Sequence, residues 1–267
     1  MKSLDFKPLT ISILSGKGGV GKSNIALNLA YALHNRGNSI LLVDGDLGLA
    51  NLDIMLGITP NKSLEDIIKQ EADPKELLIN LEQGFDFLPA SSGLPEVVDW
   101  STDLKKIILE KLNDISKQYN YTIFDLGAGI HESVIMFASM TLLRCIIITN
   151  EPTSLTDAYA VIKILYIHKN IKNFFIVVNM VKDQQEGKMA FERLRMACEK
   201  FLGLKLNLLG IVEEDKEVSK AIRKQVPLYK IAPYSKANTL LKEIAEKVVY
   251  LHEKINPLIS NSPLILD

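Results

Sequence analysis

A glycine-rich segment between an apolar run and an amphipathic segment constrains the fold of this chain most strongly. Residues 9–14 form a β-branched, largely apolar run, residues 15–23 read SGKGGVGKS, and residues 25–33 carry apolar side chains at helical spacing. The glycine-rich segment fits the phosphate-binding template G-x-x-x-x-G-K-[ST], in which backbone N–H groups and a helix N-terminus surround phosphate oxygens. A strand, this loop and a helix in succession predict an α/β protein that binds a nucleotide.

The template gives each loop residue an expected role. Lys22 is expected to reach the β- and γ-phosphates, and the Ser23 hydroxyl is expected to ligate Mg²⁺. The other residues would contribute their backbone to the phosphate cradle. The nucleotide-binding residues predicted from this segment are Gly16, Lys17, Gly18, Gly19, Val20, Gly21, Lys22, Ser23 and Asn24.

Lys17 is a second lysine that an ordinary phosphate-binding loop does not need. Beside Lys22 it adds like-charge repulsion unless a polyanion lies between the two. The run K-G-G-V-G-K-S resembles the deviant Walker A signature of the MinD-like and ParA-like dimerising ATPases. This resemblance implies that Lys17 reaches across a nucleotide sandwich to the phosphates bound by a second copy. A solvated loop charge is the alternative for Lys17.

Composition narrows the class of protein. The chain has 267 residues, of which 47% are hydrophobic, and this suits one large α/β sheet. A net charge of −1 gives no general basic field for DNA or an anionic membrane. Cys145 and Cys198 form no C-x-x-C pair, which argues against a disulfide framework, a zinc site and a carried iron–sulfur cluster. With no signal peptide and no apolar run near ~20 residues, a cytoplasmic protein is expected.

Strand and helix patterns alternate along the chain without a linker or repeat. Several strand candidates are continuous apolar runs, as expected for parallel strands covered on both faces. We therefore predict a single doubly wound, mostly parallel sheet with helices on both faces, in one domain over residues 1–255. The expected strands are residues 10–14, 39–43, 85–88, 121–125, 145–149, 174–179 and 208–212.

Three helix predictions have local signals. Asp73 before Pro74 is typical of a helix start, and Ser154 with Asp157 resembles a capping box. Residues 236–254 place apolar side chains on one stripe of a long helix. The segment 256–267 contains two prolines and no lysine or arginine, so a membrane-binding amphipathic helix is poorly supported there and a flexible tail is expected.

Two acidic motifs follow expected strands, and the carboxyl ends of such strands form the ligand-binding edge of the sheet. Asp44 and Asp46 follow residues 39–43, where a pair of acids suits either metal coordination or the positioning of a water. Asp125 ends another apolar strand in the Walker B arrangement, in which it would hold Mg²⁺. Gly127 would let a backbone N–H approach the γ-phosphate. Asp44 is expected to support the Mg²⁺ shell or the loop.

The resemblance to MinD-like proteins implies more specific roles for these acids. Asp46 would orient the attacking water, and Ser23, Asp125 and Asp46 would surround Mg²⁺. Hydrolysis of ATP would then be water attack on the γ-phosphate, driven by positioning and charge neutralisation, with catalytic residues Asp46, Lys17 and Lys22. The family usually carries Thr or Ser where this chain has Leu126, so any contact made by that hydroxyl is lost.

Asn179 ends another expected strand with a polar side chain. An unsatisfied buried amide costs about 1–3 kcal/mol, and the edge of an adenine base would satisfy it. The resemblance implies the same role for Asn179, with residues 232–234 (APY) on the other side of the base. A simple turn residue is the alternative.

Three further segments are similar to the FlhG/FleN group of flagellar-number regulators. They are residues 47–57 (LGLANLDIMLG), 87–93 (FLPASSG) and 151–159 (EPTSLTDAY). The resemblance covers about residues 9–250. It implies an ATPase that dimerises on ATP, hydrolyses it slowly under stimulation by the dimer or a partner, and regulates flagellar number and placement.

The same resemblance implies partners. They are a second copy in an ATP-dependent homodimer and the flagellar GTPase FlhF, basal-body switch proteins or a flagellar transcription activator. Longer members activate the GTPase through an N-terminal extension, whereas eight residues precede the apolar run that begins at Leu9 here, so that activity is not expected. The partner-binding face is expected on the helix beginning near Thr153, with Asp157 and Lys163.

Two other functions remain open at this stage. A division-site MinD would need membrane recruitment, for which the segment 256–267 gives weak support. A ParA-like DNA-segregation ATPase would need a basic surface stripe. The expected location is thus the cytoplasm. Association with the inner face of the membrane is a further possibility, which the sequence supports only weakly.

Overall fold

The computed structural model describes residues 7–46, 51–62, 66, 74–90, 102–260 and 262–265. Within these residues eight strands form one sheet in the order β3-β4-β2-β5-β1-β6-β7-β8. Neighbouring strands are parallel except β3 and β4, which are antiparallel. The strands are β1 (Leu9–Ser15), β2 (Ile40–Gly45), β3 (Ile79–Glu82), β4 (Phe85–Leu88), β5 (Tyr121–Ala128), β6 (Leu143–Ile148), β7 (Phe175–Val181) and β8 (Asn207–Glu213).

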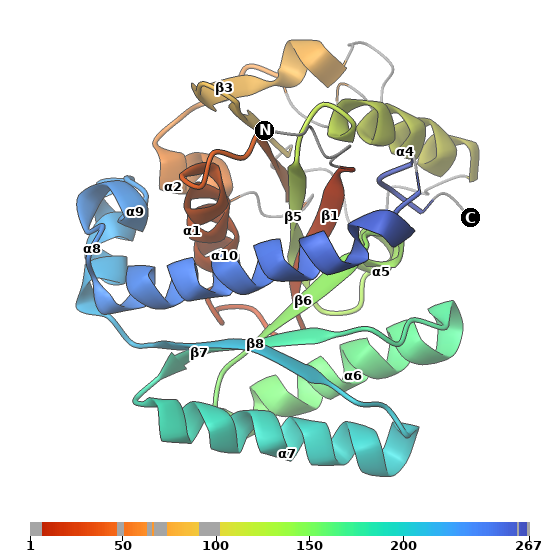
Figure 1. Cartoon of the computed structure of the whole chain (residues 1–267), viewed down its shortest axis with the longest axis vertical. Coiled ribbons are helices and arrows are strands. Elements are labelled where there is room, and N and C mark those ends of the chain that lie inside the picture. The colour runs from red at the N-terminus through yellow and green to blue at the C-terminus, as the bar shows by residue number, and fades with distance from the viewer. Residues whose placement is uncertain are drawn as a thin grey trace.

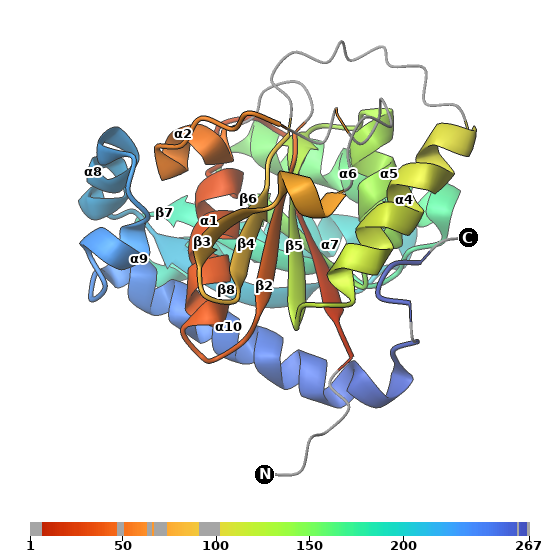
Figure 2. The same cartoon turned by 90° about the horizontal axis from the view of Figure 1, so that it is seen from above.

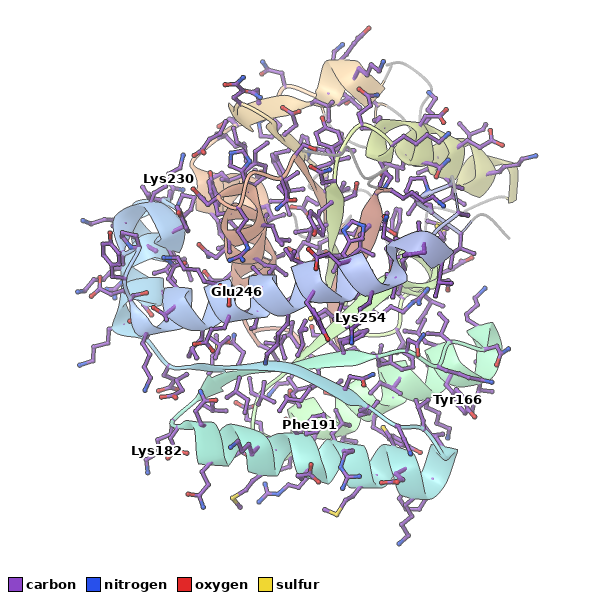
Figure 3. The ribbon with its side chains drawn as sticks, viewed as in Figure 1. Tyr166, Lys182, Phe191, Lys230, Glu246 and Lys254 are labelled. Carbon is purple, nitrogen blue, oxygen red and sulfur yellow. The ribbon has the colours of Figure 1, made fainter. Side chains whose placement is uncertain are left out.

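Helices cover both faces of this sheet (Figures 1 and 2). One hydrophobic cluster joins α1 and α10 to one face, and a second joins α4, α5, α6 and α7 to the other. Side chains fill the space between the layers (Figure 3), including Phe191 of α7, which is buried. The helices are α1 (Lys22–His34), α2 (Leu52–Leu56), α4 (Thr102–Ser116), α5 (Glu132–Met140), α6 (Pro152–Lys169), α7 (Gln184–Leu202), α8 (Lys216–Lys224), α9 (Leu228–Ile231) and α10 (Lys236–Ile255), with 3-10 helices η1 (Pro74–Leu77) and η2 (Asn256–Leu258).

Successive strand residues enter opposite clusters. In β2, Leu41 and Val43 belong to the cluster of α4–α7, whereas Ile40 and Leu42 belong to the cluster of α1 and α10. A strand buried on both faces needs no polar side, which explains the uninterrupted apolar runs. The predicted doubly wound, mostly parallel sheet is confirmed, and each predicted strand is present. The long helix predicted over residues 236–254 is α10.

Three local features differ from the prediction. The strand β3, at the antiparallel edge of the sheet, has three half-buried residues and one exposed residue, too few to give a clear alternation. Ser154 does not cap α6, because the helix begins at Pro152, and the Ser154 hydroxyl accepts a hydrogen bond from Thr149 N at 3.0 Å. Pro74 begins the 3-10 helix η1, while Asp73 lies outside the described residues.

The described residues of the C-terminal segment pack against the domain. Ile259 and Leu264 are buried, at 4% and 2% exposure. Thr10 Oγ1 donates to Pro263 O at 2.8 Å, and Ile265 N donates to Met140 O at 2.9 Å. The two prolines do prevent a long helix, but an extended chain can still bury apolar side chains and pair its backbone. The expectation of a flexible tail therefore does not describe residues 256–260 and 262–265.

Within the described part of the chain, no helix has both the length and the apolar character that crossing a membrane requires.

Candidate nucleotide-binding site

The glycine-rich loop joins the central strand β1 to α1. Gly19 and Gly21 adopt left-handed backbone conformations, with φ of 81° and 82°, which L side chains rarely take. Gly21 is the N-cap residue of α1, and no side chain caps this helix. The first backbone N–H groups of α1 are thus presented without a competing side-chain acceptor, which is the arrangement that binds anions at helix N-termini.

Both ends of the loop are held closely by neighbouring elements. A Cβ atom built on Gly16 would lie 2.2 Å from the carbonyl carbon of Asp157 in α6, and one on Gly21 would lie 2.4 Å from Asn179 Nδ2. By contrast, Gly18 and Gly19 have no such neighbour within 4 Å. The loop is therefore fixed at its ends and open in its middle.

Lys22 and Asp125 form a buried ion pair beneath the loop. Lys22 Nζ lies 2.7 Å from Asp125 Oδ1, and their side chains are 9% and 1% exposed. The Ser23 hydroxyl lies next to Asp125 and acts to lower the pKa of that carboxyl group. Burial raises the pKa of Asp125, and the charge of Lys22 acts in the opposite direction. The structure thus brings together Lys22, Ser23 and Asp125, as the sequence predicts.

Asp44 lies opposite Asp125 on the adjacent strand β2 and is fully buried. Its carboxyl group accepts hydrogen bonds from the backbone N–H groups of Asp46 at 3.1 Å and of Asn51 and Leu52 at 3.3 Å. Burial and the neighbouring Asp125 raise the pKa of Asp44. These contacts give Asp44 the loop-supporting role that was one of its two expected roles.

Asp46 lies beside the carboxyl end of β5. A Cβ atom built on Gly127 would be 3.5 Å from Asp46 Oδ1, so the two predicted γ-phosphate residues are neighbours. Leu126, between Asp125 and Gly127, is fully buried, and its Cδ2 would lie 2.8 Å from a Cβ on Gly45. Its apolar side chain packs on β2, which explains how this position functions in the fold without a hydroxyl.

The donor set beneath the loop fits Mg²⁺. Hydroxyl and carboxylate oxygens are the ligands that this ion prefers, and Ser23 and Asp125 already contact each other. Within the described residues, no group of three or more His, Cys, Asp or Glu side chains could hold a metal by itself. A magnesium ion at this point would therefore take its other ligands from water and phosphate, as it does in many nucleotide sites.

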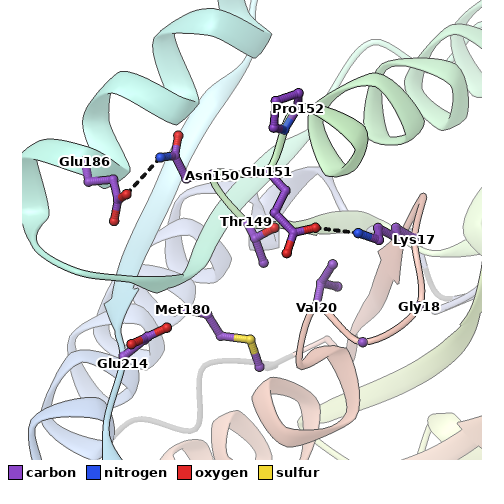
Figure 4. Close-up of a pocket in the computed structure, with 11 residues that line it drawn as sticks. Lys17, Gly18, Val20, Thr149, Asn150, Glu151, Pro152, Met180, Glu186 and Glu214 are labelled. Atoms are coloured by element: carbon purple, nitrogen blue, oxygen red, sulfur yellow. Dashed lines mark hydrogen bonds and ion pairs between the residues drawn. The ribbon is translucent and has the colours of Figure 1, made fainter.

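Lys17 lies against the start of α6. Its side chain is 39% exposed, and its Nζ forms an ion pair with Glu151 (Figure 4). The same Nζ lies 3.2 Å from Thr153 Oγ1. The two lysines of the loop thus contact different elements, Lys17 the start of α6 and Lys22 the strand β5.

Asn179 is buried and tied to the loop. Its Nδ2 donates a hydrogen bond to Val20 O at 2.8 Å, and the residue as a whole is 5% exposed. This bond satisfies part of the amide and shows that Asn179 is more than a turn residue, since it fixes the end of β7 against the loop. The contact with adenine remains a prediction.

A pocket of about 470 Å³ opens beside the middle of the loop (Figure 4). Thr149 and Met180 line it but were not predicted from the sequence, although each lies at the carboxyl end of a strand, where the general rule places ligands. Residues 232–234, expected near the base, do not line this pocket. The lining residues are Lys17, Gly18, Gly19, Val20, Thr149, Asn150, Glu151, Pro152, Met180, Glu186 and Glu214.

The expected partner-binding face of α6 is only partly exposed. Lys163 is exposed, whereas Asp157 is half-buried and its backbone lies against Gly16. Because of this contact, α6 cannot shift without displacing the start of the phosphate-binding loop.

Comparison with known proteins gives consistent matches. Residues 11–228 match the family described as CobQ/CobB/MinD/ParA nucleotide binding domain. The chain is 37% identical over 238 residues to the antiactivator FleN of Pseudomonas aeruginosa, covering 89% of this chain and 85% of FleN. It is 35% identical over 242 residues to the flagellum site-determining protein YlxH of Helicobacter pylori, covering 90% of this chain and 81% of YlxH.

A solved structure has the same architecture. The cell division ATPase MinD of Pyrococcus furiosus superposes with a TM-score of 0.74 at 25% sequence identity, over 91% of this chain and 99% of that one. The family match includes the glycine-rich loop, both acidic motifs and Asn179. The resemblance found from short motifs thus extends over most of the fold.

Proposed function

Because the chain belongs to the CobQ/CobB/MinD/ParA nucleotide-binding family, we propose that it is an ATPase that dimerises on ATP and regulates the number and placement of flagella. The observation that carries the ATPase is the contact of Lys22, Ser23 and Asp125 beneath an uncapped helix N-terminus. The flagellar role is supported by the similarity to FleN and YlxH, which reaches 37% and 35% identity over most of each chain.

The residues beneath the loop would each have a different role in ATP hydrolysis. Lys22 would exchange its bond to Asp125 for the phosphates of ATP, and Ser23 and Asp125 would hold Mg²⁺, which supplies charge neutralisation. Asp46 would orient a water, and the backbone N–H at Gly127 would approach the γ-phosphate. The proximity of Asp46 to Gly127 supports this pairing.

Lys17 would act between two copies. Its partial exposure fits a side chain whose target lies outside its own chain. Exposed ion pairs are worth about 0–1 kcal/mol, so the bond to Glu151 is weak enough to be exchanged for a phosphate contact. This arrangement supports an ATP-dependent homodimer.

The output of such a dimer would be the binding of flagellar components. Candidates are a flagellar GTPase of the FlhF type, basal-body switch proteins or a flagellar transcription activator. The close contact between Gly16 and α6 provides a physical link from the loop to the face that carries Lys163. A ligand can regulate a partner only if the partner binds the two nucleotide states differently.

A division-site ATPase is the second candidate. The similarity of the fold to MinD of Pyrococcus furiosus favours it. It predicts a division partner and a division phenotype, both of which separate it from the flagellar role.

Three substitutions in the purified chain test the ATPase and the dimer. Lys22→Ala should abolish ATP binding in calorimetry, because it removes a charge-assisted partner of the phosphates. Asp46→Ala should bind ATP and remain dimeric in size-exclusion chromatography. Lys17→Ala should bind ATP as a monomer. The control Lys188→Ala changes an exposed lysine of α7 and should behave as the unaltered protein does.

Two results would contradict these assignments. Undiminished ATP affinity in Lys22→Ala would remove the phosphate role of that lysine. Equal dimerisation of Lys17→Ala and Asp46→Ala would show that Lys17 does not act across the interface.

Deletion of the gene in its source organism tests the output. Flagellar number or placement should change without filaments or minicells, and Lys22→Ala should fail to complement. Normal flagellation with minicells would favour the division-site role and leave the ATPase intact.

A further inference from the structure

Met180 has a backbone conformation that its place in the fold does not explain. Among the described residues, Asn170, Met180 and Gln225 are the non-glycine residues with positive φ. Asn170 and Gln225 end α6 and α8, where a left-handed residue is ordinary. Met180 lies within β7, with φ of 55°, and the pairing of β7 with β8 is irregular between Val178 and Val181. Such a conformation is unfavourable for a non-glycine residue and persists where the surroundings enforce it.

The distortion directs two consecutive side chains to the same glycine. Asn179 Nδ2 and Met180 Cε would lie 2.4 Å and 3.0 Å from a Cβ atom on Gly21. In a regular strand consecutive side chains point to opposite faces, so both could not reach Gly21. The bulge at Met180 thus adds a methionine to the loop contact that Asn179 already makes.

Met180 leaves apolar surface open in the pocket beside the loop. Its residue exposure is 41%, and its side chain extends from β7 toward the loop, between Glu214 and Val20 (Figure 4). The methionine thioether is unbranched and polarisable and makes favourable contacts with aromatic rings. A flat aromatic ligand would cover this surface.

Thr149 gives an independent sign of a ligand in the same pocket. The residue is 7% exposed, and its Oγ1 is buried with no hydrogen-bond partner. A buried hydroxyl without a partner is unfavourable, and a ligand with polar groups would satisfy it. The pocket therefore offers an apolar platform and an unused hydroxyl next to a phosphate cradle.

We propose that Met180 is the platform for the base of the bound nucleotide, with its thioether covering one face of the ring while the loop holds the phosphates. The ribose or base would then contact Thr149. This assignment rests on the proposed nucleotide-binding function and adds a contact residue that the phosphate-binding motif does not contain.

Binding of ATP, ADP and inorganic tripolyphosphate, each with Mg²⁺, tests the platform in the full-length chain. Met180→Ala should weaken ATP and ADP equally, by about three- to tenfold, the scale of a sulfur–aromatic contact. Tripolyphosphate has no base, so its affinity should stay within about twofold. Met180→Gly should give the same pattern, and it protects the test from misfolding because glycine adopts this φ freely. Met189→Ala, which changes a half-exposed methionine of α7, is the matched control.

Every other pattern of affinities for the three ligands contradicts the proposed contact between Met180 and the base. Unchanged ATP and ADP affinity in both variants would show that no base contacts Met180. Equal weakening of all three ligands would show that Met180 shapes the loop instead. A loss confined to ATP would place Met180 at the contact with a second copy. If the unaltered chain binds neither ATP nor tripolyphosphate, the proposed function itself fails and the platform fails with it.

Discussion

The two lysines of the glycine-rich loop lie in opposite environments. Lys22 is 9% exposed and paired with the buried Asp125, whereas Lys17 is 39% exposed and paired with Glu151, which is 61% exposed. Breaking a buried pair leaves an uncompensated charge and costs several kcal/mol, whereas an exposed pair is worth little. One side of the loop is therefore fixed by burial, and the other can change partners.

Replacing each lysine by methionine is the strongest test of this difference. Lys22→Met keeps most of the side-chain volume but leaves Asp44 and Asp125 without a buried cation. In metal-free and nucleotide-free protein it should lower the free energy of unfolding by about 3 kcal/mol at neutral pH. Lys17→Met should change it by less than about 0.5 kcal/mol. Urea denaturation of both variants measures the contrast, and equal losses would contradict it.

The loss in Lys22→Met should also depend on pH. Burial raises the pKa of both Asp44 and Asp125, so the folded protein holds their protons more tightly than the unfolded chain does. The stability from such groups falls as pH rises through the interval between the unfolded and folded pKa values. The charge of Lys22 lowers the pKa of both carboxyl groups in the folded protein. Removing this charge therefore raises the folded-state pKa values further, so the pH interval over which stability is lost extends to higher pH. The deficit should be larger near about pH 8 than near about pH 5, and a pH-independent deficit would contradict this account.

The glycines of the loop give the second contrast. Gly16→Ala places a Cβ about 2 Å from the backbone of α6, so the helix or the loop must shift, and stability should fall by about 2 kcal/mol or more. Gly18→Ala meets no atom within 4 Å and should be nearly neutral, within about 0.5 kcal/mol. Thermal unfolding of the two variants measures this difference. Equal melting temperatures would show that the loop is not held at Gly16.

The smallest expected effect concerns the partner of Lys17. Glu151→Gln removes the charge of the ion pair but keeps the shape of the side chain, so Lys17 becomes free to reach a second copy. The dimer with ATP should tighten by about two- to fivefold, the value of an exposed ion pair, with little change in stability. Analytical ultracentrifugation measures the dimer affinity. A weaker dimer would show that Glu151 itself contacts the nucleotide or the second copy.

Much of the fold could be predicted because its signals are local. The buried strands are continuous apolar runs, and the loop between β1 and α1 is a template of fixed spacing. The antiparallel strand β3 escaped prediction because a short, half-buried edge strand has no clear pattern. The C-terminal segment was misjudged because prolines forbid a helix but not packing, and the acceptors for its backbone come from Asn113 and Met140.

Residue types at short spacing were enough to predict the sheet, the glycine-rich loop and the acids beneath it. Which side chains contact one another depends instead on how the chain folds in three dimensions. Lys17 pairs with Glu151 and Asn179 with Val20, although these partners are far apart in the chain. The left-handed Met180 also depends on the irregular pairing of β7 with β8. Such contacts follow from strand order and register, which bring distant segments of the chain together. No local sequence pattern encodes that order and register.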